Sequence, residues 1–251
     1  MGHGILVSLS KCIAKVLAKP SHQHRPNLPD SKAKLISSLR VADVLLVEGD
    51  SRISNYIKYL TQSNWSHAAL YIGIKKINGV DMHALVEADI EEGVRLISLD
   101  HYLNHNLRIC RPIALTDQEC LQVVQFALER VGIEYDLKNI IDLARYLFPV
   151  SLIAPFISKS RTLFLGSGEP TKAICSTLIA QAFQSIKYPI LPIIHSHTEH
   201  YCLGCVNEIF KVRHYSLFVP RDFDLSPYFQ IIKLESDLNL DYRSIKWHEE
   251  S

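Results

Sequence analysis

The dipeptide Asn78-Gly79 most constrains the fold, because it lies between two segments in which apolar and polar residues alternate. Asn-Gly is the strongest short signal for a tight turn between antiparallel strands. It predicts a hairpin that joins a strand over 67–74 to a strand over 82–88. A second turn at Glu91-Glu92-Gly93 leads to the apolar segment 94–97. The sequence therefore predicts an antiparallel meander of three strands.

The two faces of the first strand differ in composition. Every even position from 68 to 74 is apolar, whereas His67 begins the other face, followed by Ala69 and Tyr71. Because successive side chains of a strand point to opposite faces, we expect His67 on a face that is wet or functional. On the next strand, one face carries His83, Leu85 and Glu87.

Helical periodicity predicts helices around this meander. One covers 51–60, one opens at Thr116 with Glu119 in capping-box spacing, and one opens at Thr171. The last of these carries Cys175 in its first turn and an apolar stripe over 174–186. A sheet with helices against it indicates an α+β fold.

The remaining segments set the domain boundaries. Residues 1–19 predict an amphipathic helix, 20–34 contain three prolines and predict a linker, and 35–251 form one catalytic α+β domain. Within that domain we expect strands over 41–47 and 215–219, and a structural clamp at 221–228. The apolar segment 140–165 has no clean period.

Charge and cysteine content exclude several classes. Lys and Arg number 27 against 26 Asp and Glu, so no positive excess favours nucleic acid as a partner. Six cysteines in 251 residues are too few for a disulfide scaffold. We find no signal peptide and no membrane-spanning segment, and expect a cytoplasmic protein. The amphipathic segment 5–17 either docks on the body or makes peripheral membrane contact.

Three residue types that support acyl transfer occur on these elements. A cysteine in the first turn of a helix is activated by the unpaired N–H groups there, which favours Cys175 as a nucleophile. His67 is the candidate base on the sheet and Glu87 the candidate group that orients it, with His83 as its competitor. Each alone is also compatible with a structural role: Cys175 as core filler, His67 as a structural histidine and Glu87 as an ordinary strand carboxylate.

Four blocks of this sequence resemble the permuted papain-like amidases, in the YiiX-like branch. They are residues 41–73, which end in Trp65-Ser66-His67 and the strand that follows, and the blocks Val86-Glu87-Ala88, 132–136 and Ile174-Cys175-Ser176. These proteins are circularly permuted relatives of the NlpC-type cell-wall peptidases, with histidine before cysteine in the chain. The resemblance implies a circularly permuted papain-like fold, in which an antiparallel sheet packs against a nucleophile-bearing helix.

The resemblance also implies roles for individual residues. Cys175 becomes the nucleophile, His67 the general base and Glu87 its orienter, in a reaction that needs neither cofactor nor metal. Trp65, Tyr135 and His83 become candidate substrate contacts. Ile174 stands where the family often has an aromatic residue, which bears on substrate preference.

The substrate is an amide or ester of a small molecule, a lipid or a peptide. The apolar segment 143–165 and the amphipathic segment 5–17 favour a lipid or acylated substrate over a polar cell-wall peptide. Water or an amine would accept the acyl group, so hydrolase and acyltransferase both stay open. The sequence does not define the oligomeric state.

Three other interpretations remain open. The fold could serve as a non-catalytic acyl- or lipid-binding module. The loop 195–205 could form a zinc-binding module, because it brings together His195, His197, His200, Cys202 and Cys205. The chain could also be a secreted effector that modifies a host protein or lipid.

Overall fold

The computed structural model describes residues 32–77, 79–89, 92–133, 174–198 and 206–233. The predicted N-terminal helix, most of the predicted linker and the apolar segment 140–165 lie outside these ranges. The first described element, α2 (Lys32–Ser38), begins just before the expected start of the domain. None of the helices in the described ranges is long and apolar enough to cross a membrane.

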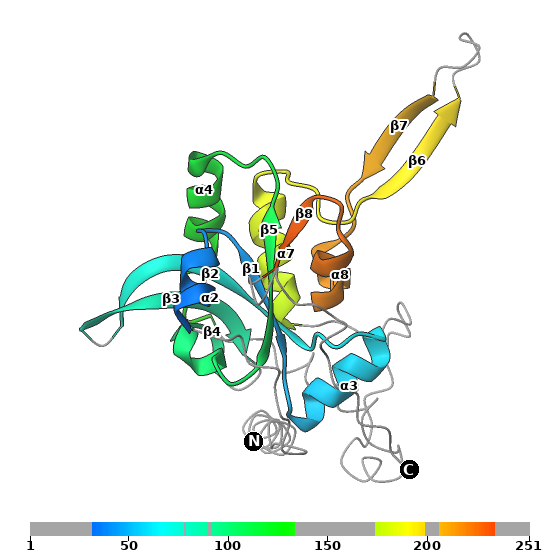
Figure 1. The fold of residues 1–251 in the computed structure, drawn as a ribbon. Coiled ribbons are helices and arrows are strands. Elements are labelled where there is room, and N and C mark those ends of the chain that lie inside the picture. The colour runs from blue at the N-terminus through cyan, green and yellow to red at the C-terminus, as the bar shows by residue number, and fades with distance from the viewer. Residues whose placement is uncertain (1–31, 78, 90–91, 134–173, 199–205, 234–251) are drawn as a thin grey trace, which may run out of the picture.

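Six strands form one antiparallel sheet in the order β4-β3-β2-β1-β5-β8 (Figure 1). They are β1 (Val44–Glu48), β2 (His67–Ile77), β3 (Val80–Asp89), β4 (Gly93–Ser98), β5 (Asn106–Pro112) and β8 (Phe229–Ile232). The predicted meander is confirmed as β2, β3 and β4. Gly79 has the positive φ, 84°, that the turn after Asn78 requires.

Helices cover both faces of this sheet. The face that carries Ala68, Leu70 and Val86 packs against α4 (Asp117–Leu128) and α7 (Ile174–Ser185). The opposite face packs against α2 and a short 3-10 helix, η1 (Leu99–Tyr102). Ala69 and Tyr71 are buried there because α2 and η1 cover this face, so of the two alternatives for it, wet or functional, the wet one was wrong.

Side chains cap the starts of two helices, and one of these caps was predicted. Ser51 accepts a hydrogen bond from the Ser54 N–H at the start of α3 (Arg52–Thr61). Thr116 and Glu119 form a capping box at the start of α4, as their spacing predicts.

The predicted strand over 215–219 was wrong. The chain forms a 3-10 turn, η3 (Tyr215–Leu217), and then the helix α8 (Pro220–Leu225). Pro220 fits the first position of a helix, where no N–H is needed, so it starts α8 and ends the extended segment.

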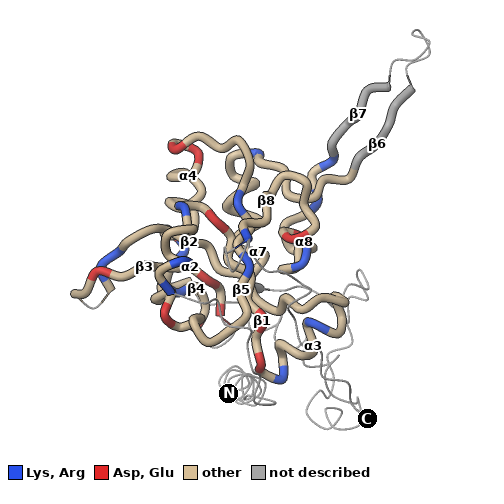
Figure 2. The backbone as a smooth tube through the Cα atoms, viewed as in Figure 1, with Lys and Arg blue, Asp and Glu red and all other residues tan. Residues whose placement is uncertain are grey.

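A two-stranded ribbon, β6 (Ile193–Thr198) and β7 (Val206–Lys211), projects from the body (Figure 1). Residues 195–198 of the predicted His/Cys loop belong to β6. Basic and acidic residues are interspersed along the described elements (Figure 2), in keeping with the balanced composition.

Candidate active site

The candidate nucleophile lies where α7 begins. Cys175 is the second residue of the helix, only 5% of its surface is exposed, and it packs against Val219. The Ser176 hydroxyl donates a hydrogen bond of 2.8 Å to the Phe218 carbonyl oxygen, which ties this helix end to the segment before α8. Thr171, the predicted cap, lies outside the described residues.

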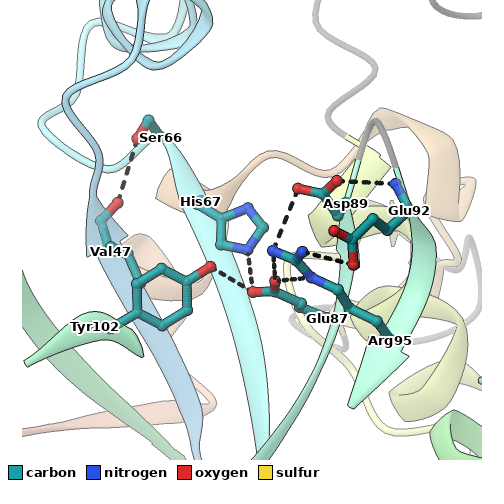
Figure 3. Close-up of polar contacts among 8 residues, drawn as sticks. All are labelled: Val47, Ser66, His67, Glu87, Asp89, Glu92, Arg95 and Tyr102. Atoms are coloured by element: carbon teal, nitrogen blue, oxygen red, sulfur yellow. Dashed lines mark hydrogen bonds and ion pairs between the residues drawn. The ribbon is translucent and has the colours of Figure 1, made fainter. Parts of the chain in front are cut away.

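The candidate base begins β2, at the point where the sheet opens. The β1–β2 ladder extends to the pair Val47↔His67, whereas the β2–β3 ladder stops at Leu70↔Val86. Beyond that pair, side chains occupy the space between β2 and β3. His67 points across it to Glu87, and its Nε2 lies 2.8 Å from Glu87 Oε2 (Figure 3).

The ring nitrogen of His67 that does not contact Glu87 can interact with the Cys175 thiol. The His67 ring lies beside Cys175, since the charge and the hydrogen-bonding capacity of each shift the pKa of the other. An ionised carboxylate only accepts hydrogen bonds, so Nε2 donates to Glu87 and Nδ1 is the nitrogen left for sulfur. The three side chains therefore lie in the order thiol, imidazole, carboxylate.

Electrostatics in this group favour a thiolate. Burial raises the pKa of Cys175, but the His67 charge, the His67 hydrogen bond and the N–H groups of Ala68 and Ser176 outweigh it, so the net pKa is lowered. Burial lowers the pKa of His67, yet the charges of Cys175 and Glu87 leave it well above the ordinary value. A lowered thiol pKa beside a raised imidazole pKa favours the thiolate–imidazolium form of the pair.

Glu87 is fully buried, and its carboxylate makes three hydrogen bonds and one further ion-pair contact (Figure 3). Oε2 accepts from His67 and from the Tyr102 hydroxyl. Oε1 accepts a hydrogen bond of 2.8 Å from Nε of Arg95 and forms an ion pair with Nη2 at 2.7 Å. Burial raises the pKa of Glu87, but these partners lower it to about 2, so the group is a carboxylate at neutral pH.

Arg95 and Tyr102 were missed as members of this site. The hairpin gave a signal for Arg95: a tight turn between Asp89 and Gly93 puts Arg95 directly opposite Glu87 in the β3–β4 ladder. Tyr102 gave none, because it reaches Glu87 from the 3-10 helix η1, whose position depends on packing far along the chain.

Trp65, a candidate substrate contact, is held in a structural cluster. Its Nε1 donates to Asp224 at 3.1 Å, and Arg108 lies over its ring at 4.9 Å. Arg108 also binds both carboxylate oxygens of Asp224, at 2.7 and 2.8 Å. These contacts, with the bond of 2.8 Å from Arg221 to the Thr61 carbonyl oxygen, confirm the predicted clamp at 221–228.

His83, the second candidate substrate contact, is not brought to this group. His83 lies four residues from Glu87 along β3, about 13 Å at strand spacing. It pairs with the Tyr71 hydroxyl at 2.6 Å and lines a separate surface cavity of about 650 Å³ beside Asp43 and Arg111. Tyr135 lies outside the described residues.

No set of three or more potential metal ligands occurs among the residues that the structure describes. His195 and His197 lie two residues apart on β6. His200, Cys202 and Cys205, the other members of the proposed zinc loop, fall outside the described ranges.

Comparison with known proteins agrees with the geometry. A family model described as permuted papain-like amidase enzyme, YaeF/YiiX, C92 family, matches residues 38–160. This segment contains His67, Glu87, Arg95 and Tyr102, and Cys175 follows it. A search of curated proteins found no match.

Among solved structures, the chain is similar to one described as the metalloprotein YiiX from Escherichia coli O157:H7. That similarity has 15% sequence identity and a TM-score of 0.46, and covers 79% of this chain and 98% of the other. By the family match, residues 38–160 are similar to the permuted papain-like amidases, a family of cysteine-peptidase-like hydrolases.

Proposed function

We propose that this protein cleaves an amide or ester bond by covalent catalysis, with Cys175 as nucleophile, His67 as general base and Glu87 as the group that orients His67. One observation supports this above all: a thiol in the first turn of a helix lies beside an imidazole, and a ring nitrogen of that imidazole contacts a buried carboxylate. Nucleophile, base and orienter are then in contact in the order that acyl transfer requires.

The reaction proceeds in two halves. His67 takes the proton of Cys175, and the thiolate attacks the carbonyl carbon, which forms a C–S bond and an oxyanion. When the C–N or C–O bond breaks, His67 gives that proton to the leaving group. Water, or an amine in a transferase, then gives its proton to His67 and attacks the acyl-enzyme. The C–S bond breaks, and the thiolate takes the proton back.

The backbone N–H of Cys175 is the first donor we assign to the oxyanion. It belongs to the first turn of α7, whose N–H groups have no partner within the helix and whose dipole favours negative charge. No step of this scheme requires a metal or a cofactor.

The substrate class we propose is an acyl amide or ester with an apolar chain. The support is in the sequence: the segments 5–17 and 143–165 are rich in Leu, Ile, Val and Phe. Esters of p-nitrophenol with acyl chains of graded length test this directly. We expect kcat/KM to rise with chain length, and a series that is flat or falls beyond acetate would contradict the lipid preference.

Labelling by an acyl probe tests the catalytic proposal itself. Wild-type protein treated with p-nitrophenyl acetate should form a thioester on Cys175, detected by intact mass and peptide mapping. Cys175→Ala should not form it, and His67→Ala should form it about 10²- to 10⁴-fold more slowly, as for loss of a general base.

Cys120→Ser is the matched control, because Cys120 is a half-buried cysteine on α4 that makes no contact with this group in our scheme. It should acylate at the wild-type rate. Acylation of wild type no faster than Cys175→Ala would exclude the enzyme and favour a non-catalytic binding module. Equal rates in His67→Ala and wild type would remove His67 from its role.

A further inference from the structure

The carboxylate of Glu87 carries a charge in a buried place, and its surroundings show which group compensates it. The groups that face it are His67 from β2, Arg95 from β4 and Tyr102 from η1, with Cys175 on α7 behind His67. Asp89 and Glu92 face Arg95 from the β3–β4 turn. With Cys175 and His67 as an ion pair, Arg95 is the cation that balances Glu87.

The two oxygens of the Glu87 carboxylate have different partners. Arg95 contacts Oε1 through Nε and Nη2, at 2.8 and 2.7 Å. Oε2 accepts hydrogen bonds from His67 and Tyr102. The guanidinium is itself fixed from its other side by Glu92 at 3.0 Å and Asp89 at 3.5 Å. Because Arg95 engages Oε1, Oε2 is the oxygen left to face the imidazole and the Tyr102 hydroxyl.

We propose that Arg95 is a positioning residue of this site, which holds Glu87 ionised and aligned so that Glu87 fixes the His67 ring with its free nitrogen toward Cys175. This inference rests on the proposed function. Arg95 touches neither the thiol nor a substrate in this scheme and acts through Glu87. Neither the family match nor the sequence pattern assigns it a role.

Removal of Arg95 has two separable consequences. Loss of a positive charge favours protonation of every neighbouring group, so thiolate should form at a higher pH. Loss of the two contacts to Oε1 lets the carboxylate and the imidazole move, so the catalytic rate should fall even where the thiolate is fully formed.

Two measurements on the full-length protein report these consequences. The rate of Cys175 alkylation by iodoacetamide, followed by peptide mapping between pH 4 and 10, gives the midpoint of thiolate formation. The pH-independent plateau of kcat/KM for p-nitrophenyl acetate gives the alignment. Arg95→Gln should raise the midpoint by about one pH unit and lower the plateau about ten- to hundredfold.

Lysine at position 95 separates the effect of the positive charge from the effect of the two contacts to Oε1. Arg95→Lys keeps the positive charge but has no planar fork, so the midpoint should return close to wild type while the plateau stays low. Lys76→Gln is the matched control, because it removes one exposed positive charge nine residues from His67 along β2. It should change neither quantity.

A folded Arg95→Gln protein with the wild-type midpoint and plateau overturns the proposal. If Arg95→Gln does not fold, judged by circular dichroism, Arg95→Lys decides alone, and a wild-type plateau in that variant overturns it. Failure of the proposed function looks different: the wild-type midpoint would then be that of an ordinary thiol and would not respond to His67→Ala.

Discussion

Three carboxylates are buried in the described part of the chain, and each has an arginine as partner. The pairs are Asp43 with Arg111, Glu87 with Arg95 and Asp222 with Arg213. Burial raises the pKa of Asp43 and of Asp222 in spite of their arginines, whereas the pKa of Glu87 falls to about 2. Glu87 differs from the other two in its additional partners, the His67 imidazole and the Tyr102 hydroxyl, which lower its pKa together with Arg95.

The structural pair at Asp43 gives a prediction at this scale. Arg111 donates to both oxygens of Asp43, at 2.9 and 2.7 Å, and to the Ser38 carbonyl oxygen. Arg111→Leu leaves a buried, uncompensated carboxylate, which should cost about 3–5 kcal/mol of unfolding free energy at pH 7.

The pH dependence of that cost has a definite sign. Without Arg111, the pKa of Asp43 rises further above its unfolded value, so the folded variant binds a proton more tightly than the unfolded chain. Its stability is then lost as pH rises, and the cost should be smaller at pH 5 than at pH 7. Urea unfolding at both pH values measures it, with the exposed Arg52→Leu as control. Equal costs at pH 5 and pH 7 would contradict this account.

At the scale of elements, the sequence predicts what local chemistry determines. The turn at Asn78-Gly79 and the capping box at Thr116 are each set by neighbouring residues, and both are confirmed. Cys175, His67 and Glu87 were placed on a helix start and two adjacent strands, which is where the structure has them.

The errors occur where distant packing decides. The apolar residues Phe218 and Val219 were assigned to a strand, but they pack on the start of α7, and Pro220 turns the chain into a helix. The strands β5 and β8 were missed. Each pairs with a segment far away in the sequence, since β5 pairs with both β1 and β8. No local turn in the sequence predicts that pairing.

The clamp of α8 leads to a prediction about this element. α8 has six residues, too few to be stable without packing, and its Asp224 is bound by Trp65 and Arg108. Asp224→Ala should reduce stability by about 1–3 kcal/mol, because two charged or polar donors lose a partly buried acceptor.

The same variant should expose the thiol. Val219, which packs on Cys175, immediately precedes α8, so a loosened α8 should raise hydrogen exchange over 219–225 and speed the alkylation of Cys175. Asp81→Ala removes an exposed acid on β3 and is the matched control. Faster exchange without faster alkylation would show that Val219 stays in place independently of the clamp.

For the whole molecule, the chain order matters more than the local pattern. The proposed base, its orienter and the residues that contact them lie between positions 67 and 102, whereas the proposed nucleophile and the segment packed on it lie between 175 and 225. The clamp contacts join residues 159 and 116 positions apart. The site exists only when these two parts of the chain are folded together, so its protonation must contribute to global stability.

The acid limb of the stability curve tests that contribution. Glu87 has a pKa of about 2 in the folded protein against 4.5 for a free side chain. A lowered pKa adds stability that is complete above pH 4.5 and is lost as pH falls toward 2, with a total of roughly 3 kcal/mol. Glu87→Gln lacks this contribution, so the difference in unfolding free energy between wild type and Glu87→Gln should shrink between pH 6 and pH 3.

Urea unfolding at pH 6, 4.5 and 3 measures this difference. Glu129 is exposed and directly follows α4. The unfolding free energy of Glu129→Gln should stay within about 0.5 kcal/mol of wild type at all three pH values. A difference for Glu87→Gln that stays constant down to pH 3 would mean that Glu87 titrates alike in the folded and unfolded chains. The contacts of the Glu87 carboxylate would then not favour its ionised form over its protonated form. Glu87 could not stabilise an imidazolium at His67.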